Sequence, residues 1–114
     1  MKTLDPRAAA RAAVAPNSSR PATAVVHDTD DLRLVVFRLE AGQSVPPHRS
    51  VSSVMLTVLE GKGVLSGEAD GAPVDVDCGP GDVVTYDPNE LHGMRAGSGE
   101  LLLLATITPR PGSR

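Results

Sequence analysis

The chain has 114 residues, a net charge of −3 and one cysteine, with 40% apolar and 22% charged residues, so we expect one soluble domain without an internal disulfide. Aromatic residues make up only 2% and acidic residues outnumber basic ones, which argues against a base-stacking or phosphate-binding surface for nucleic acid. The chain lacks both a run of about 18 apolar residues and the apolar block of a signal peptide, so we expect a cytoplasmic protein without a membrane partner.

Residues 1–23 are expected to form an N-terminal leader or arm. Asp5 can cap a short helix that begins at Pro6 and continues through an alanine-rich segment. The prolines at positions 16 and 21 end any helix. The sequence leaves open whether this segment is loose or packs on a neighbouring subunit.

The pattern from residue 24 onwards is typical of short strands separated by glycine and proline turns. The predicted strands are residues 24–27, 32–39, 54–59, 63–66, 74–78, 83–86 and 101–107. The alternating strand 74–78 is expected to turn its apolar side to a core, and the continuous apolar run 101–107 predicts a strand buried on both faces. Asp70-Gly71 signals a hairpin turn. Such spacing predicts an all-β sandwich or barrel over residues 24–108, followed by a C-terminal tail, residues 109–114.

Two segments of the chain share one design, in which a glycine turn leads through an extended stretch to a single histidine. The first begins at Gly42 and delivers His48 before a strand that stops at Gly61. The second begins at Gly79 and delivers His92. If the two segments face each other, both imidazoles point into one cavity.

These two segments resemble the two sequence motifs of the cupins. Gly42, His48 and Gly61 have the spacing of the first motif, and Pro80-Gly81-Asp82 and His92 have that of the second. The resemblance covers residues 32–108. It implies a small single-domain, RmlC-like cupin with a double-stranded β-helix, or jelly-roll barrel, and a homodimer.

The turn before His92 departs from the family pattern. Asp87 and Asn89 stand where a proline and a glycine are expected, although Pro88 lies in the turn. Asparagine tolerates a left-handed backbone better than most residues, so we expect the turn to be kept.

The ligand positions of the first motif depart further. In the family, two histidines and a glutamate of the first motif and the histidine of the second usually hold a divalent metal. Here Ser50 takes the place of the second histidine and Val54 that of the glutamate. Transition-metal sites need about three protein ligands. We therefore expect no cofactor, with weakly held iron, manganese, nickel or zinc at His48 and His92 as the alternative.

Four other side chains could in principle supply a further metal ligand. Each has a more ordinary expected role: an exposed His27, a packed Cys78 thiol, a barrel-lining Tyr86 whose hydroxyl forms hydrogen bonds, and a solvated Glu90.

With the strand phase taken from the resemblance, Val54, Leu56 and Val58 face the ligand side. The predicted ligand-binding residues are His48, Ser50, Val54, Leu56, Tyr86 and His92. An apolar pocket with few polar groups is typical of small-molecule sites. Without a metal, partial burial should lower the pKa of the histidines and keep them neutral.

Three functions remain open at this point, beside a purely structural role for the histidines. The first is a small-molecule-binding cupin without a complete metal site. The second is a metal-dependent dioxygenase or isomerase, and the third is a metal-free enzyme that uses a histidine as general acid or base. The fold serves enzymes and binding proteins alike, so it does not decide between them.

Overall fold

The computed structural model describes residues 1–112, so the last two residues of the predicted C-terminal tail lie outside it. The described part consists of one helix and seven strands: α1 (Pro6–Ala12), β1 (Ala22–Asp28), β2 (Arg33–Leu39), β3 (Ser44–His48), β4 (Ser53–Ala69), β5 (Ala72–Cys78), β6 (Val83–Tyr86) and β7 (His92–Thr108). The prediction of an all-β jelly-roll barrel is confirmed.

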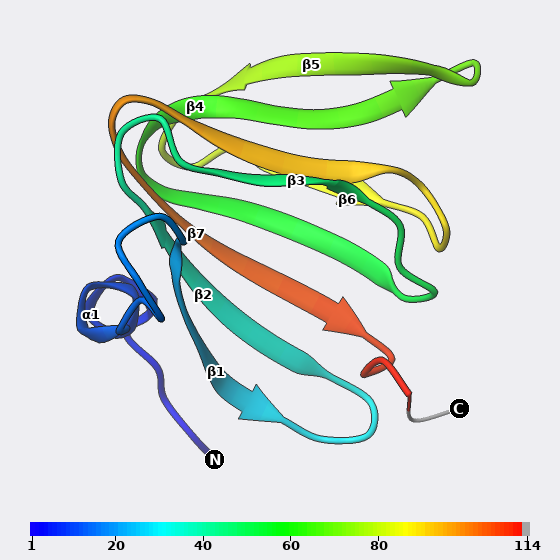
Figure 1. Ribbon diagram of the computed structural model, residues 1–114. Coiled ribbons are helices and arrows are strands. Elements are labelled where there is room, and N and C mark those ends of the chain that lie inside the picture. Colours follow the sequence, from blue (N-terminus) through cyan, green and yellow to red (C-terminus); the bar gives the residue numbers. More distant parts are fainter. Residues whose placement is uncertain (113–114) are drawn as a thin grey trace.

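The two long strands β4 and β7 build both layers of the barrel. They pair antiparallel from Ser53 opposite Thr108 to Ser66 opposite Gly93. The first half of β4 and the second half of β7 form one layer, in the order β1-β2-β7-β4-β6. The other halves form a second layer, in the order β3-β7-β4-β5. In Figure 1 the two layers meet at the left, where β4 and β7 bend from one into the other.

Glycines in β4 make this bend possible. Gly61 has a φ of 85°, and a Cβ at this position would lie 1.9 Å from the carbonyl oxygen of Glu100. The pairing of β4 with β7 shifts register on both sides of Gly61, as expected of β-bulges at a barrel corner. The predicted strands 54–59 and 63–66 are therefore one continuous, bent strand.

The core lies between the two layers. Leu56, Val58, Leu65 and Leu103 are at most 1% exposed. Met55, on the opposite side of β4 from Leu56, is 36% exposed, so the predicted phase of this strand is confirmed.

The outer face of the first layer is covered by the N-terminal helix. The Asp5 side chain accepts a hydrogen bond from the backbone N–H of Ala8 (3.1 Å), and Pro6 is the first helical residue, as predicted. Ala10 is fully buried against Val36 and Leu102. Small alanine side chains let the helix approach the sheet closely, and the arm therefore lies on the barrel of its own chain (Figure 1).

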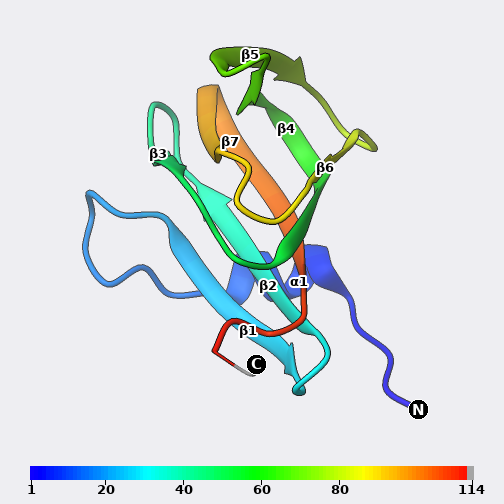
Figure 2. The same cartoon turned by 90° about the vertical axis from the view of Figure 1, so that its right-hand side faces the viewer.

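Strand β5 does not pack as predicted. Its Val74 and Val76 are 40% and 52% exposed, so the expectation that they face a closed core is wrong. The strand pairs only with β4 and forms an edge of the second layer, as Figure 2 shows at the top of the molecule. No helix within residues 1–112 combines the length and apolar character needed to cross a membrane.

Candidate functional site

The two histidines of the paired motifs lie side by side. His48 ends β3 and His92 begins β7, and the two residues are direct partners in the antiparallel pairing of these strands. Their ring centroids are 4.2 Å apart, with the planes tilted by 59°. The predicted convergence of the two imidazoles is confirmed.

Backbone carbonyl groups fix the tautomer of both rings. The Nδ1 atom of His48 lies 3.0 Å from the carbonyl oxygen of Pro46, and that of His92 lies 3.2 Å from the carbonyl oxygen of Glu90. A carbonyl oxygen can only accept, so each Nδ1 carries the hydrogen. In the neutral rings, each Nε2 then holds a lone pair that can accept a hydrogen bond.

The loops beside the histidines are tied together by Arg49. Its guanidinium donates to both carboxylate oxygens of Glu68, at 2.6 and 3.0 Å, and to the carbonyl oxygen of Asn89 at 2.8 Å. The backbone N–H of Asn89 in turn donates to the carbonyl oxygen of Ser50 at 2.6 Å. The loop after β3 is thereby fixed to the turn before β7. Asn89 has a φ of 66°, so the left-handed turn expected at this position is present.

A cavity of about 380 Å³ opens beside the two rings. Five of the six residues predicted to bind a ligand line it, namely His48, Ser50, Val54, Leu56 and His92. Further apolar walls come from strands that the sequence did not connect with the site: Phe37, Val45, Met94, Ala105 and Ile107. Among the lining residues that the structure describes there is no carboxylate.

The two histidines differ in exposure. His48 is exposed at the mouth, whereas His92 is only 5% exposed. Burial lowers the pKa of His92, and the neighbouring His48 lowers it further. The expectation of a buried histidine with a lowered pKa therefore holds for His92, whereas His48 is exposed rather than partly buried.

Contrary to the prediction, Tyr86 does not line this cavity. Its hydroxyl donates to the backbone carbonyl of Ser66 at 2.9 Å, and burial raises its pKa to about 12. Its ring contacts that of His92, with centroids 5.2 Å apart, but lines a different groove. The hydroxyl is therefore already engaged and turned away from the histidine pair.

The remaining possible donors lie elsewhere. Cys78 is packed in the core, as expected, and burial raises the pKa of its thiol. His27 is half-buried in β1 rather than exposed, and Glu90 is half-buried in the groove of Tyr86. Within residues 1–112 no three His, Cys, Asp or Glu side chains gather in a way that could hold a metal ion. Two imidazoles alone do not fit a resident transition metal, which needs about three protein ligands.

Comparison with known proteins gives a consistent result. A family model described as a cupin domain matches residues 35–107. An RmlC-like cupin from Desulfovibrio desulfuricans is 28% identical, with a TM-score of 0.77 over 96% of this chain and 97% of that one.

Two further solved structures share the fold. The protein TT1209 from Thermus thermophilus has a TM-score of 0.78 at 23% identity, over 97% of this chain and all (100%) of that one. An uncharacterised double-stranded β-helix protein from Klebsiella pneumoniae has a TM-score of 0.77 at 20% identity, over 92% and 90% of the two chains. No protein of curated function matches the sequence significantly.

Proposed function

This chain belongs to the cupin family, and we propose that it binds a small, mainly apolar molecule beside His48 and His92 without a resident transition metal. The observation that carries the proposal is the hydrogen bonding of the two rings. Both Nδ1 atoms are used by backbone carbonyls, so two neighbouring Nε2 acceptors remain. In the described part of the chain, no side-chain nitrogen or oxygen atom is both fully buried and without a hydrogen-bond partner. The Nε2 atom of His92 has no such partner, so it must be accessible to a ligand or solvent although the residue as a whole is buried.

The chemistry of the cavity supports one class of ligand. Two imidazole Nε2 acceptors call for a ligand that brings a donor, and a hydroxyl group meets this need. Arg49 also lines the cavity, but its guanidinium is paired with Glu68. The rest of the molecule should be apolar, because the walls are formed by side chains such as Leu56, Met94 and Ile107. A volume of about 380 Å³ is at the small end of ligand sites. A substituted phenol or a medium-chain alcohol combines these properties.

The metal-dependent alternative makes a different prediction. Histidines that ligate metals also donate through the second ring nitrogen to a backbone carbonyl, which is the arrangement of His48 and His92. The positions that would complete the donor set hold Ser50 and Val54, however, and Val54 cannot coordinate. Elemental analysis of protein purified without added metal separates the two: stoichiometric, tightly held iron, manganese, nickel or zinc would contradict our proposal.

A matched pair of probes tests the proposal directly. We expect 4-ethylphenol to bind about threefold to tenfold more tightly than 4-ethylanisole in calorimetry, because only the phenol can donate to an imidazole. His92→Phe should reduce this preference while keeping a planar ring, and the double variant His48→Phe, His92→Phe should abolish it. His27→Gln is the control, because His27 lies in β1 and does not line the cavity. Equal binding of the phenol and the ether by the unaltered protein would refute the role of the imidazoles as acceptors.

A further inference from the structure

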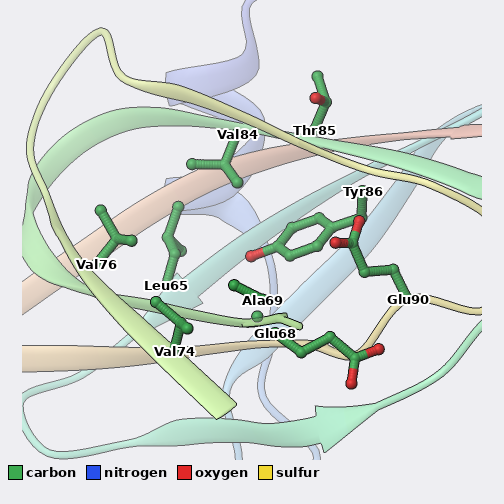
Figure 3. A pocket seen from close by; sticks show the side chains of 10 residues that line it. Leu65, Glu68, Ala69, Val74, Val76, Val84, Thr85, Tyr86 and Glu90 are labelled. Atoms are coloured by element: carbon green, nitrogen blue, oxygen red, sulfur yellow. The ribbon is translucent and has the colours of Figure 1, made fainter. Parts of the chain in front are cut away.

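A second, smaller groove lies between the unpaired edges of β5 and β6. It has a volume of about 170 Å³ and is formed mainly by apolar side chains. In Figure 3, Leu65, Val74, Val76 and Val84 gather at one end, and the ring of Tyr86 extends towards them from the other. The exposed faces of Val74 and Val76 belong to this groove, so the apolar surface of β5 has a definite location.

The other end of the groove is acidic. Figure 3 shows the side chains of Glu68 and Glu90 there, beside the base of Tyr86. Glu68 is already neutralised, because Arg49 donates to both of its carboxylate oxygens. Glu90 accepts from the backbone N–H of Asp87 through Oε1 at 2.9 Å, and its other oxygen has no partner among the described residues. One carboxylate oxygen with unused acceptor capacity therefore faces the groove.

The sequence segment that forms the groove contains no cation that could compensate this charge. Residues 63–94 include no lysine or arginine, but they include 7 of the 14 acidic residues. All 11 lysines and arginines lie outside this segment. Arg49 and Arg95 form ion pairs with Glu68 and Asp75 from outside, which still leaves five of the seven carboxylates without a cationic partner among the described ion pairs. The groove therefore lies in a negative field that attracts cations.

From this arrangement we infer that the groove binds small alkylammonium or arylammonium ions. The apolar part of such an ion would pack against Leu65, Val74 and Val76. The ammonium group would lie at Glu90, next to the Tyr86 ring, whose π electrons also attract cations. A volume of about 170 Å³ limits the occupant to a group of roughly side-chain size. This site is separate from the histidine cavity and does not depend on the function proposed for it.

The test compares hexylammonium chloride with hexan-1-ol by NMR of the full chain, with the methyl groups of Val74, Val76 and Val84 as reporters. We expect saturable shifts of these methyls with hexylammonium, and at least about twofold weaker binding of the neutral alcohol. Raising NaCl from about 0.02 M to about 0.3 M should weaken hexylammonium binding, because exposed charges are screened. Shifts confined to Val54 and His92 would assign the amine to the other cavity and would overturn the inference.

Two conservative variants separate a local contact from the general field. Glu90→Gln keeps an oxygen for the Asp87 N–H and should weaken hexylammonium binding about twofold to fivefold. Asp77→Asn removes the same charge on the opposite face of β5, because Asp77 alternates with Val76, and should change binding less. An equal effect of both variants, or the same affinity for the alcohol and the amine, would contradict the inference. Failure of phenol binding at the histidine cavity would leave this result unaffected.

Discussion

Restoring the two missing ligand positions should create a metal site in this barrel. Ser50 and Val54 occupy the places of the second histidine and the glutamate of the first cupin motif, and both line the cavity with His48 and His92. In the double variant Ser50→His, Val54→Glu, four donors would surround one point. The backbone that positions them is unchanged, because it is set by the turns and by the pairing of β3 with β7.

The expected magnitudes follow from the burial of Val54, which is 5% exposed. Removing a buried valine costs about 1.5–3 kcal/mol, and leaving a carboxyl group in an apolar wall costs about 1–3 kcal/mol. Without metal, the double variant should therefore be less stable than the unaltered protein by roughly 3–5 kcal/mol. A metal at about 100 times its dissociation constant returns about 2.7 kcal/mol, which raises Tm by roughly 10 °C.

The assay is thermal unfolding followed by circular dichroism, with and without Ni²⁺ or Zn²⁺. The single variants Ser50→His and Val54→Glu should respond less than the double variant, and adding His48→Ala to the double variant should abolish the response. If the unaltered protein gains as much Tm from the metal as the double variant, its own site is complete and our reasoning is wrong. A folded double variant without any response would show that the four positions do not converge.

Three further predictions concern the backbone, the pH dependence and the buried hydroxyl. In denaturant unfolding, Gly61→Ala should prevent folding or lower the stability by more than about 3 kcal/mol, because the new Cβ would collide with a carbonyl oxygen. Gly71→Ala is the control: its Cβ would have no atom within 4 Å, so it should cost only the backbone strain of about 1–2 kcal/mol. The pKa of His92 is lowered by folding, so the unfolded chain binds the proton more readily. Stability should therefore fall as the pH drops below about 6.5, and less so in His92→Phe; a pH-independent stability difference between the two proteins would exclude this linkage. Tyr86→Phe should cost about 0.5–1.5 kcal/mol, since it removes a buried hydrogen bond, and an unchanged unfolding midpoint would argue against that bond.

The fold could be predicted where local pattern and turn chemistry agree. The run 101–107 is apolar on both sides, and Leu101 and Leu102, which point to opposite faces, are both fully buried. Strand β3 was missed because it contains Pro46-Pro47, and proline is a poor strand signal. The exposure of Val76 was missed for a different reason. Alternation shows that a strand has an apolar face, but not whether a second layer covers it.

The candidate site was predictable only in part. The spacing of the motifs located His48 and His92, and strand alternation added Val54 and Leu56. Tyr86 lies opposite Val54 in the pairing of β4 with β6, yet its ring reaches past the histidine cavity to the Ser66 carbonyl. Side-chain reach and the choice of a hydrogen-bond partner are set by three-dimensional packing, and no spacing along the chain encodes them.

The walls from Phe37, Met94 and Ile107 escaped prediction for a related reason. Phe37 and Ile107 come from the paired strands β2 and β7 of the first layer, and Met94 from the part of β7 that lies in the second layer. They converge only when the two layers stack, and each is an ordinary apolar strand residue in its local sequence. The link from Arg49 to Glu68 likewise joins a loop to a strand 19 residues away. Contacts of this kind depend on tertiary topology, so a single sequence provides no signal for them.

The residues that shape a cupin barrel and those that give it chemistry are physically separable in this chain. Gly61 is required by a carbonyl oxygen 1.9 Å from where its Cβ would be, so its loss would disturb the bend of β4 and the whole barrel. Ser50 and Val54 meet no such constraint: a valine in an apolar wall stabilises the barrel more than an unpaired carboxylate does. The turns and the pairing of β3 with β7 therefore keep His48 opposite His92 with a serine at position 50 and a valine at position 54. Strand pairing and backbone carbonyls hold the histidine pair, so its geometry does not depend on the residues at positions 50 and 54.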